Sequence, residues 1–155
     1  MVDRVSPDAR SAMMAAVRHE DTKPEKLVRS SLFAAGYRFR LHRRDLPGSP
    51  DIVLPRFRLA VFVHGCFWHG HDCPRGRLPK SNVEFWSSKI ERNRARDVAS
   101  AAALTSLGWE VAIVWACRVG EGTDYLIETL KKRVPEDLSP GFRGRPQTPP
   151  VHLID

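Results

Sequence analysis

Residues 61–73 read VFVHGCFWHGHDC, an apolar run that passes directly into a loop rich in histidine and cysteine. With the preceding Arg-Leu-Ala, the apolar part has the length and the β-branched content of a short buried strand. The stretch holds three histidines, two cysteines and an adjacent Phe-Trp pair. Histidine with cysteine is typical of a metal site, and histidine is also the usual acid–base catalyst near neutral pH. The chemistry of this chain is therefore expected where a strand ends and its loop begins.

Three further strands are predicted around this one. Residues 51–54 (DIVL) are short and apolar, and a rigid Pro-Gly-Ser-Pro turn precedes them. Residues 109–116 (WEVAIVWA) predict a buried central strand, whereas residues 37–43 (YRFRLHR) alternate as a half-exposed strand does. Together with the strand at 58–64, these segments supply a small sheet.

Four segments share an N-terminal capping signal that is followed by apolar residues at helical spacing. They cover about 6–18, 22–35, 81–107 and 123–134. The capping signals are Ser6 with the proline after it, the capping boxes TKPE and SNVE at 22–25 and 81–84, and Thr123. Four helices are therefore expected.

The order helix–helix–strand–strand–strand–helix–strand–helix predicts the mixed α/β class, with a central mixed sheet flanked by helices. Three consecutive strands do not form repeating βαβ units, and the chain has neither a G-x-G-x-x-G nor a Walker motif. Both observations argue against a doubly wound nucleotide-binding sheet. We expect one domain over residues 1–135, which begins with the helix at about 6–18, and a proline-rich C-terminal arm over residues 136–155.

The composition is that of a basic globular protein. The 155 residues are 42% hydrophobic and 28% charged, and 25 Lys and Arg residues against 18 Asp and Glu give a formal net charge of +7. This excess favours a polyanionic partner, and it is concentrated in residues 37–45 (YRFRLHRRD) and 89–97 (KIERNRARD). No apolar run has the length of a membrane span, and the N-terminus lacks the apolar stretch of a signal peptide. We expect a cytoplasmic protein with no membrane partner.

The three cysteines of the chain and one histidine form a candidate metal site. Cys66, His71 and Cys73 lie within one loop, and Cys117 follows the predicted central strand. Three sulfurs and one nitrogen are a common ligand set for structural Zn²⁺. The spacing is not that of a standard zinc finger, and two other interpretations remain: buried thiols that never meet, or a disulfide between Cys66 and Cys73. A reducing compartment disfavours the disulfide.

A second candidate site lies beside the first. If residues 51–54 and 58–64 form a hairpin, Asp51 lies next to His64 at the end of the sheet. A carboxylate at a sheet edge is a hard oxygen ligand that suits Mg²⁺, and Mg²⁺ suits phosphate chemistry. The alternative interpretation of Asp51 is a turn residue after the Pro-Gly-Ser-Pro sequence.

Four stretches together resemble the very-short-patch (Vsr) DNA mismatch endonucleases. They are GSPDIVL (48–54), VFVHGCFWHGHDC (61–73), EFWSSKIERNRARD (84–97) and LGWEVAIVWAC (107–117). The resemblance implies a restriction-endonuclease-like fold and an enzyme that nicks double-stranded DNA 5′ to the thymine of a T·G mismatch. Such mismatches arise when 5-methylcytosine deaminates, and the nick begins very short patch repair.

The resemblance also implies roles for the residues of the second site. Asp51 and the backbone carbonyl of Val63 would hold catalytic Mg²⁺, and His69 would be the general base that activates water. His64 would act at the phosphate, and Glu25 would orient the histidine or a metal-bound water. The family commonly has threonine where this chain has Val63, but the ligand there is the carbonyl, which valine retains.

Further residues are expected to contact DNA. By resemblance, the aromatic residues Phe67, Trp68 and Trp86 would enter the base stack from the major groove, and the N-terminal helix would bring Met13 or, as we predict, Met14 to the opposite groove. Without the resemblance, these aromatic and methionine side chains would be read as core. Four basic residues of the helix that carries Trp86 would meet phosphates, although a charged helix face is often only solvated. They are Lys89, Arg92, Arg94 and Arg96.

Two competing hypotheses belong to this pattern. One is a non-catalytic, zinc-containing DNA-binding module, which would require the aspartate and the two spare histidines to be structural. The other is a nuclease of the same fold that cuts unmismatched DNA at a recognition site. The favoured prediction is a monomeric Mg²⁺-dependent mismatch endonuclease with one structural Zn²⁺ site; the sequence indicates no further repair-protein partner.

Overall fold

The computed structural model describes residues 6–17, 20–133 and 151–154. The elements follow in the order α1 (Pro7–Ala15), α2 (Lys23–Ala34), β1 (Arg40–Leu41), β2 (Ile52–Leu54), β3 (Leu59–His64), α3 (Val83–Ser106), β4 (Glu110–Trp115), α4 (Val119–Lys131) and β5 (Val151–Ile154). Short 3₁₀ turns cover Pro55–Phe57, Pro74–Gly76 and Ala116–Arg118. Within these described ranges, no helix is long and apolar enough to cross a membrane.

The strands form one mixed sheet in the order β1-β2-β3-β4-β5. β1 and β3 run antiparallel to β2, whereas β3, β4 and β5 are parallel to one another. The predicted mixed α/β class and the predicted order of the first eight elements are therefore confirmed. Most of the expected C-terminal arm, residues 136–150 and 155, lies outside the described residues; only 151–154 of it are described, and they form β5 beside β4.

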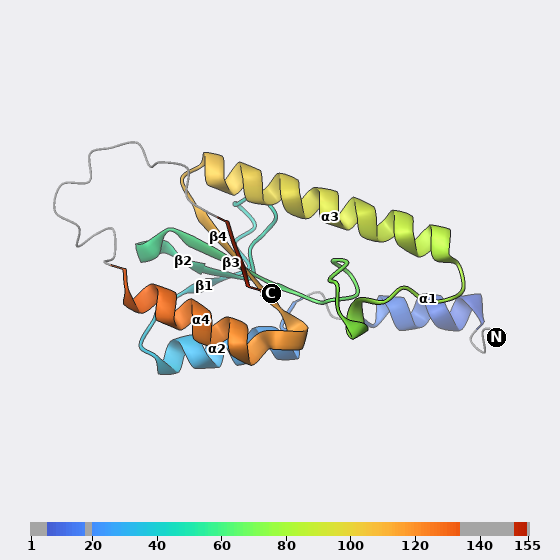
Figure 1. Cartoon of the computed structure of the whole chain (residues 1–155), viewed down its shortest axis with the longest axis horizontal. Coiled ribbons are helices and arrows are strands. Elements are labelled where there is room, and N and C mark those ends of the chain that lie inside the picture. Colours follow the sequence, from blue (N-terminus) through green and yellow to red (C-terminus); the bar gives the residue numbers. More distant parts are fainter. Residues whose placement is uncertain (1–5, 18–19, 134–150, 155) are drawn as a thin grey trace.

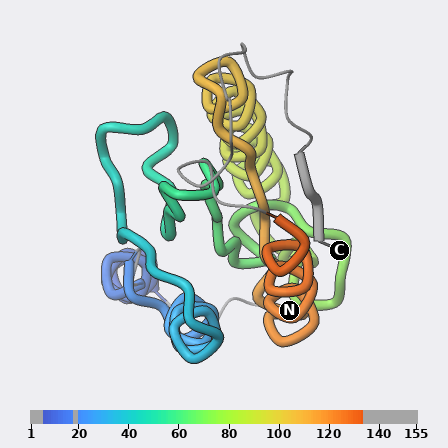
Figure 2. Tube along the Cα trace, turned by 90° about the vertical axis from the view of Figure 1, so that its left-hand side faces the viewer, coloured from blue at the N-terminus to red at the C-terminus, as the bar shows by residue number. Residues whose placement is uncertain are grey.

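Helices cover both faces of the sheet. α3 lies along one face, and α2 and α4 lie together on the other (Figure 1); the end-on tube shows the same three layers (Figure 2). Because side chains alternate along a strand, Val61 and Val63 pack with α2 and α4, whereas Ala60 packs with Trp109 and Leu104 on the α3 face. The two faces thus have separate cores that share one sheet.

Two of the four predicted caps form. The Ser6 side chain accepts from the backbone N–H of Ala9 at 3.2 Å, and Thr22 accepts from Glu25 at 3.4 Å. Both residues have the extended backbone that an N-cap requires.

The other two caps are wrong. α3 begins after Asn82, whose left-handed backbone (φ 52°) makes no side-chain cap, so SNVE is not a capping box. α4 begins at Val119, four residues before Thr123, and the Thr123 hydroxyl instead donates to the Val119 carbonyl at 2.5 Å. Two glycines in that first turn lower its helix propensity. One of them, Gly122, is buried, so tertiary packing stabilises the helix at these positions.

One end of the sheet gathers the residues of interest. His64 is the last residue of β3 and pairs in register with Trp115, the last residue of the parallel strand β4. Since β2 is antiparallel to β3, the start of β2 lies at the same end, next to Asp51. The loop at 65–82 leaves β3 at this end and leads into α3.

Candidate active site

A cavity of about 550 Å³ opens at this end of the sheet, between the N-terminus of α2 and the middle of α3. All four predicted catalytic residues line it, and so does Val63; the four are Glu25, Asp51, His64 and His69. They come from separate elements, since Glu25 belongs to α2 and His69 to the loop after β3. The structure therefore brings together side chains that lie up to 44 positions apart, 25 to 69, in the chain.

Asp51 is held against the neighbouring strand. Its Oδ2 accepts a hydrogen bond from the Val63 backbone N–H at 2.7 Å, as the hairpin of β2 and β3 requires. Burial raises the pKa of Asp51 from 3.8 to about 6, and the negative charge of Glu25 adds to the rise while the Val63 hydrogen bond opposes it. The carboxylates of Asp51 and Glu25 both line this cavity. Carboxylate oxygens are ligands that a divalent cation prefers.

The two histidines form a stacked pair. The imidazole rings of His64 and His69 are parallel within 3°, with centroids 3.7 Å apart. His69 donates from Nδ1 to Oδ2 of Asp97 at 2.6 Å, which leaves Nε2 as its acceptor nitrogen. Burial, and secondarily the charge of His69, lower the pKa of His64 to about 3, so His64 is neutral near pH 7.

Sequence reasoning missed Asp97 as the partner of His69. Asp97 belongs to the stretch KIERNRARD, whose cations suggested only a phosphate-binding face. The signal available in the sequence was an acidic residue that interrupts a basic run. In the structure this residue lies on α3 with its side chain only 26% exposed. A buried acid beside a candidate base is the usual way to fix the tautomer and orientation of that base.

Glu25 is the centre of a network that the sequence did not predict. It is 2% exposed, and its Oε2 accepts from the Asp21 backbone N–H at 3.0 Å and from Arg29 Nη2 at 3.1 Å. The same guanidinium lies 2.7 Å from the Asp21 carboxylate and 3.0 Å from Nε2 of His42. Arg29 lowers the pKa of Asp21 through its hydrogen bond and charge. The i, i+4 spacing of Glu25 and Arg29 was the signal available for this pair.

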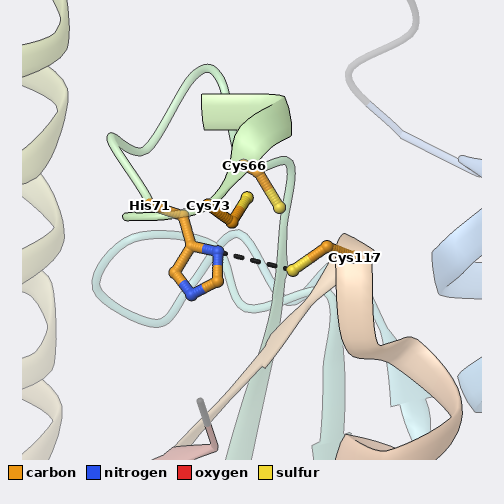
Figure 3. Close-up of side chains that lie close together, drawn as sticks. All are labelled: Cys66, His71, Cys73 and Cys117. Atoms are coloured by element: carbon orange, nitrogen blue, oxygen red, sulfur yellow. Dashed lines mark hydrogen bonds between the residues drawn. The ribbon is translucent and has the colours of Figure 1, made fainter. Parts of the chain in front are cut away.

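The three cysteines and His71 converge beside this cavity (Figure 3). One ligand atom from each of Cys66, His71, Cys73 and Cys117 lies within 4.8 Å of the others, and His71 Nδ1 is 3.4 Å from the sulfur of Cys117. The cysteines are free thiols, so the alternatives of a Cys66–Cys73 disulfide and of thiols that never meet are wrong for this structure. The four atoms are therefore close enough together to hold one metal ion, and three sulfurs with one nitrogen are a common donor set for a structural metal site.

The thiols of this cluster have opposed proton affinities. Burial raises the pKa of Cys73, but hydrogen bonds from His71, Cys66 and the backbone lower it to about 7. Burial and the neighbouring thiols raise the pKa of Cys117 to about 11. A metal ion bound between these sulfurs would favour their thiolate forms, so the close thiols are well suited to bind one cation together.

The cluster loop is folded tightly enough to require glycine. A Cβ on Gly76 would lie 1.9 Å from the His71 carbonyl oxygen, a distance that no structure tolerates. At Gly70, which has a φ of 64°, a Cβ would lie 2.7 Å from Ile90 on α3. The ligand loop is therefore packed both on itself and on α3.

We expect Gly76→Ala to disrupt the ligand loop and to cost about 3 kcal/mol or more of unfolding free energy, because the clash is with backbone and cannot be relieved by a rotamer change. Gly120→Ala is the matched control: a Cβ there meets nothing within 4 Å, and alanine in a helix should gain about 0.5–1 kcal/mol. Urea unfolding of both variants measures the difference. Equal stability of the two variants would contradict the tight loop.

The predicted DNA-inserting aromatic residues form one cluster. The Phe67 ring lies 5.0 Å from Trp68 and 5.3 Å from Trp86, and the two indoles are 6.1 Å apart. Phe67 and Trp68 are half-buried, whereas Trp86 is only 7% exposed and supports them from below. Phe85, which was not predicted, is 55% exposed and packs on Trp86 at 5.1 Å. Lys89 places its ammonium within 5.5–6.0 Å of three of these rings.

A second hollow of about 660 Å³ connects this aromatic cluster with α1. Met14 of α1 lines it together with Trp68 and His69, and two of the four predicted phosphate-binding cations, Lys89 and Arg96, line it too. The other two, Arg92 and Arg94, are exposed on α3 outside this lining. Met13 is 63% exposed. The hollow thus joins an apolar patch, cations and His69 in one surface.

Comparison with known proteins agrees with this arrangement. The family model described as "DNA mismatch endonuclease Vsr" matches residues 2–75. The chain is 60% identical over 121 residues to "Type II nicking enzyme V.XorIIP" of Xanthomonas oryzae, which is 78% of this chain and 89% of the relative. It is 43% identical over 119 residues to "Type II nicking enzyme V.NmeAIP" of Neisseria meningitidis, covering 77% of this chain and 85% of the relative.

A third relative spans the whole chain. "DNA mismatch endonuclease Vsr" of Escherichia coli is 37% identical over 155 residues, which is 99% of both chains. Identity of this level over the full length includes the segments that supply the cavity, the cysteine cluster and the aromatic residues. The chain is a DNA-cleaving hydrolase and belongs to the Vsr family of DNA mismatch endonucleases.

Proposed function

We propose that this protein nicks double-stranded DNA 5′ to the thymine of a T·G mismatch and so begins very short patch repair. One observation carries the proposal: Asp51 and the His69–Asp97 pair line a single cavity that adjoins a hollow lined by Trp68, Met14 and the cations Lys89 and Arg96. The mixed sheet with a carboxylate at its edge supports a restriction-endonuclease-like fold. A monomer that works in the cytoplasm on nucleoid DNA is the simplest form of this proposal.

The proposed hydrolysis depends on the orientation of His69. Because Asp97 accepts a hydrogen bond from Nδ1–H, Nε2 is free to take a proton from a water molecule as that water attacks the phosphorus. Asp97 then stabilises the imidazolium that forms. His64, which is neutral and buried against His69, would hydrogen-bond to the phosphate without adding charge.

Asp51 and the Val63 carbonyl are the proposed Mg²⁺ ligands. When bound, Mg²⁺ would supply the positive charge that a phosphodiester requires as its leaving oxygen departs. The Val63 N–H holds one carboxylate oxygen of Asp51, which fixes the carboxylate at the sheet edge and leaves the other oxygen for a cation. Glu25 is tied to Arg29, and its proposed role is to orient water and the neighbouring polar groups of the cavity.

The cysteine cluster is proposed to hold Zn²⁺ in a structural role. Three thiolates and one imidazole would complete a tetrahedral shell and leave no position for substrate or water. Such an ion would tie the loop at 65–82 to the end of β4 and so fix His69, which lies in that loop between two of the ligands.

Mismatch selectivity is proposed to come from the aromatic cluster. Inserting an apolar wedge into duplex DNA costs about a few kcal/mol per base step, and the cost is lower where the bases are mispaired. Phe67 and Trp68 both pack against the buried Trp86, which limits their movement, and Met14 lines the same hollow as Trp68. Lys89, Arg92, Arg94 and Arg96 are proposed to hold the flanking phosphates.

A second candidate is a nuclease of the same fold that nicks unmismatched DNA at a recognition sequence. Two relatives are named "Type II nicking enzyme". These names favour the second candidate, because they state nicking and do not mention a mismatch. A non-catalytic DNA-binding module receives no such support, since the family is one of endonucleases.

Two labelled duplexes that differ only in one T·G or T·A pair separate the candidates. With Mg²⁺ present, we expect a single nick on the 5′ side of the mispaired thymine and none in the T·A duplex. Equal cutting of both duplexes would favour the second candidate. A panel of flanking sequences around the T·G pair then shows how much of the surrounding sequence is read.

A further inference from the structure

Trp115 lies between the cysteine cluster and the histidine pair. It is the last residue of β4, is 8% exposed, and pairs in register with His64 across the parallel strands. Its indole stacks on the imidazole of His71, with centroids 4.3 Å apart and planes 13° from parallel. Its other neighbour is His64, whose ring it meets edge-on at 5.3 Å.

These contacts make a continuous row of rings from one site to the other. His71, a cluster ligand, stacks on Trp115; Trp115 packs against His64; and His64 stacks on His69 at 3.7 Å. The row ends at the hydrogen bond from His69 to Asp97. In a close-packed interior, a side chain that has rigid planar neighbours on two sides cannot move without moving one of them.

The indole is retained at some cost. Its Nε1 is fully buried and has no hydrogen-bond partner among the described residues, and a buried N–H without a partner lowers the stability of the folded state. A buried polar group without a partner often marks a functional position. Leucine would fill the core of the α3 face without that cost, so a planar ring is the property that matters here.

We propose that Trp115 is a positioning residue that transmits the order of the Cys66–His71–Cys73–Cys117 cluster to the His64–His69 pair. The inference rests on the proposed role of His69 as the base. When the cluster is closed by a metal ion, His71 is fixed; the indole is then fixed against it and holds the plane of His64, on which the His69 ring lies. Misplacement of a reacting group by about 1 Å can cost about 100-fold in rate.

The test compares Trp115→Leu, Trp115→Phe and the control Trp109→Leu in the full-length, metal-loaded protein. Trp109 immediately precedes β4 at its other end, is also 8% exposed and belongs to the same core cluster, so its loss costs similar packing far from the histidines. We expect Trp115→Leu to lower kcat by about 10–100-fold while KM for DNA changes by less than about twofold. Trp115→Phe should restore most of kcat, and Trp109→Leu should lower only the melting temperature.

A second measurement does not depend on nicking. The imidazole ¹H–¹³C signals of His69, which stacks on His64, should shift in Trp115→Leu and not in Trp109→Leu. Replacing the cluster metal with Cd²⁺, which is larger, should shift the His64 signals of the wild type and have a smaller effect in Trp115→Leu.

Unchanged His69 signals in Trp115→Leu, or a Cd²⁺ effect equal to that of the wild type, would overturn the inference. So would a loss of kcat that Trp109→Leu reproduces. A wild-type protein that does not discriminate T·G from T·A contradicts the proposed function but leaves these histidine signals able to decide the role of Trp115.

Discussion

Asp51→Asn is expected to abolish nicking and, in the absence of divalent metal, to make the protein more stable. Burial of the Asp51 carboxylate, together with the negative charge of Glu25, raises its pKa to about 6. Asparagine has nearly the same shape and can still accept from the Val63 N–H, but it carries no charge. The residue that is proposed to bind the catalytic cation would thus be an unfavourable residue for folding, as is common for active-site groups.

The sign of the pH dependence follows from this shift. The pKa of Asp51 is about 6 in the folded protein against 3.8 ordinarily, so between these values the folded state binds more protons and stability falls as pH rises. The penalty is complete above about pH 6–7 and absent below about pH 4. At 1.36 kcal/mol per pKa unit, its size at pH 8 is about 3 kcal/mol at most.

Thermal unfolding of the wild type and Asp51→Asn in chelator, from pH 4 to pH 8, measures this penalty. The two melting temperatures should separate as pH rises, with the variant the more stable. Added Mg²⁺ should stabilise the wild type and leave the variant unchanged, because an ion that binds only the folded state shifts the equilibrium toward it.

Glu110→Gln is the matched control, because Glu110 is also a buried carboxylate but is paired with Arg133. Removing one partner of a buried pair destabilises the protein, so the control should have the opposite sign. If Asp51→Asn were less stable than the wild type at pH 8, Asp51 would be a structural residue and the proposed cation site would be wrong.

Local patterns were enough to predict most elements of this fold. The apolar runs at 51–54, 58–64 and 109–116 contain the observed strands β2, β3 and β4, because buried strands need β-branched residues whatever their partners are. The cap prediction for α3 was wrong because the path of the preceding loop sets the backbone at the helix start. Asn82 has a left-handed backbone there, which no local sequence rule predicts.

The candidate site was predictable to the extent that its residues are chemically unusual. Three cysteines in a chain of 155 residues have few possible partners, so counting them with His71 was sufficient. Asp97, Arg29 and His42 were missed because their types are common in basic stretches, and their roles arise only from which helix packs against which strand. Trp115 was indistinguishable from any buried strand residue until its neighbours were known.

Cys117→Ser is expected to release the cluster metal and to destabilise the α3 side of the protein. Cys66, His71 and Cys73 all belong to the loop after β3, whereas Cys117 follows β4, so it is the ligand that ties this loop to a second strand. Its side chain also packs against the core of the α3 face, and the described core on the α2 and α4 face contains none of the four cluster residues. The loss should therefore affect one layer more than the other.

The expected effect is large because a structural Zn²⁺ contributes about 10–16 kcal/mol of apparent binding free energy in small zinc domains, so losing even part of it should cost more than about 3 kcal/mol here. Metal content after dialysis and the urea midpoint measure the two parts of the effect. Ala116→Ser is the control, since it introduces the same hydroxyl one position earlier and removes no ligand; it should keep the metal. A Cys117→Ser protein with a full equivalent of tightly bound metal would show that the four-ligand set is wrong, and the ring contact from His71 to Trp115 would then need another source of order.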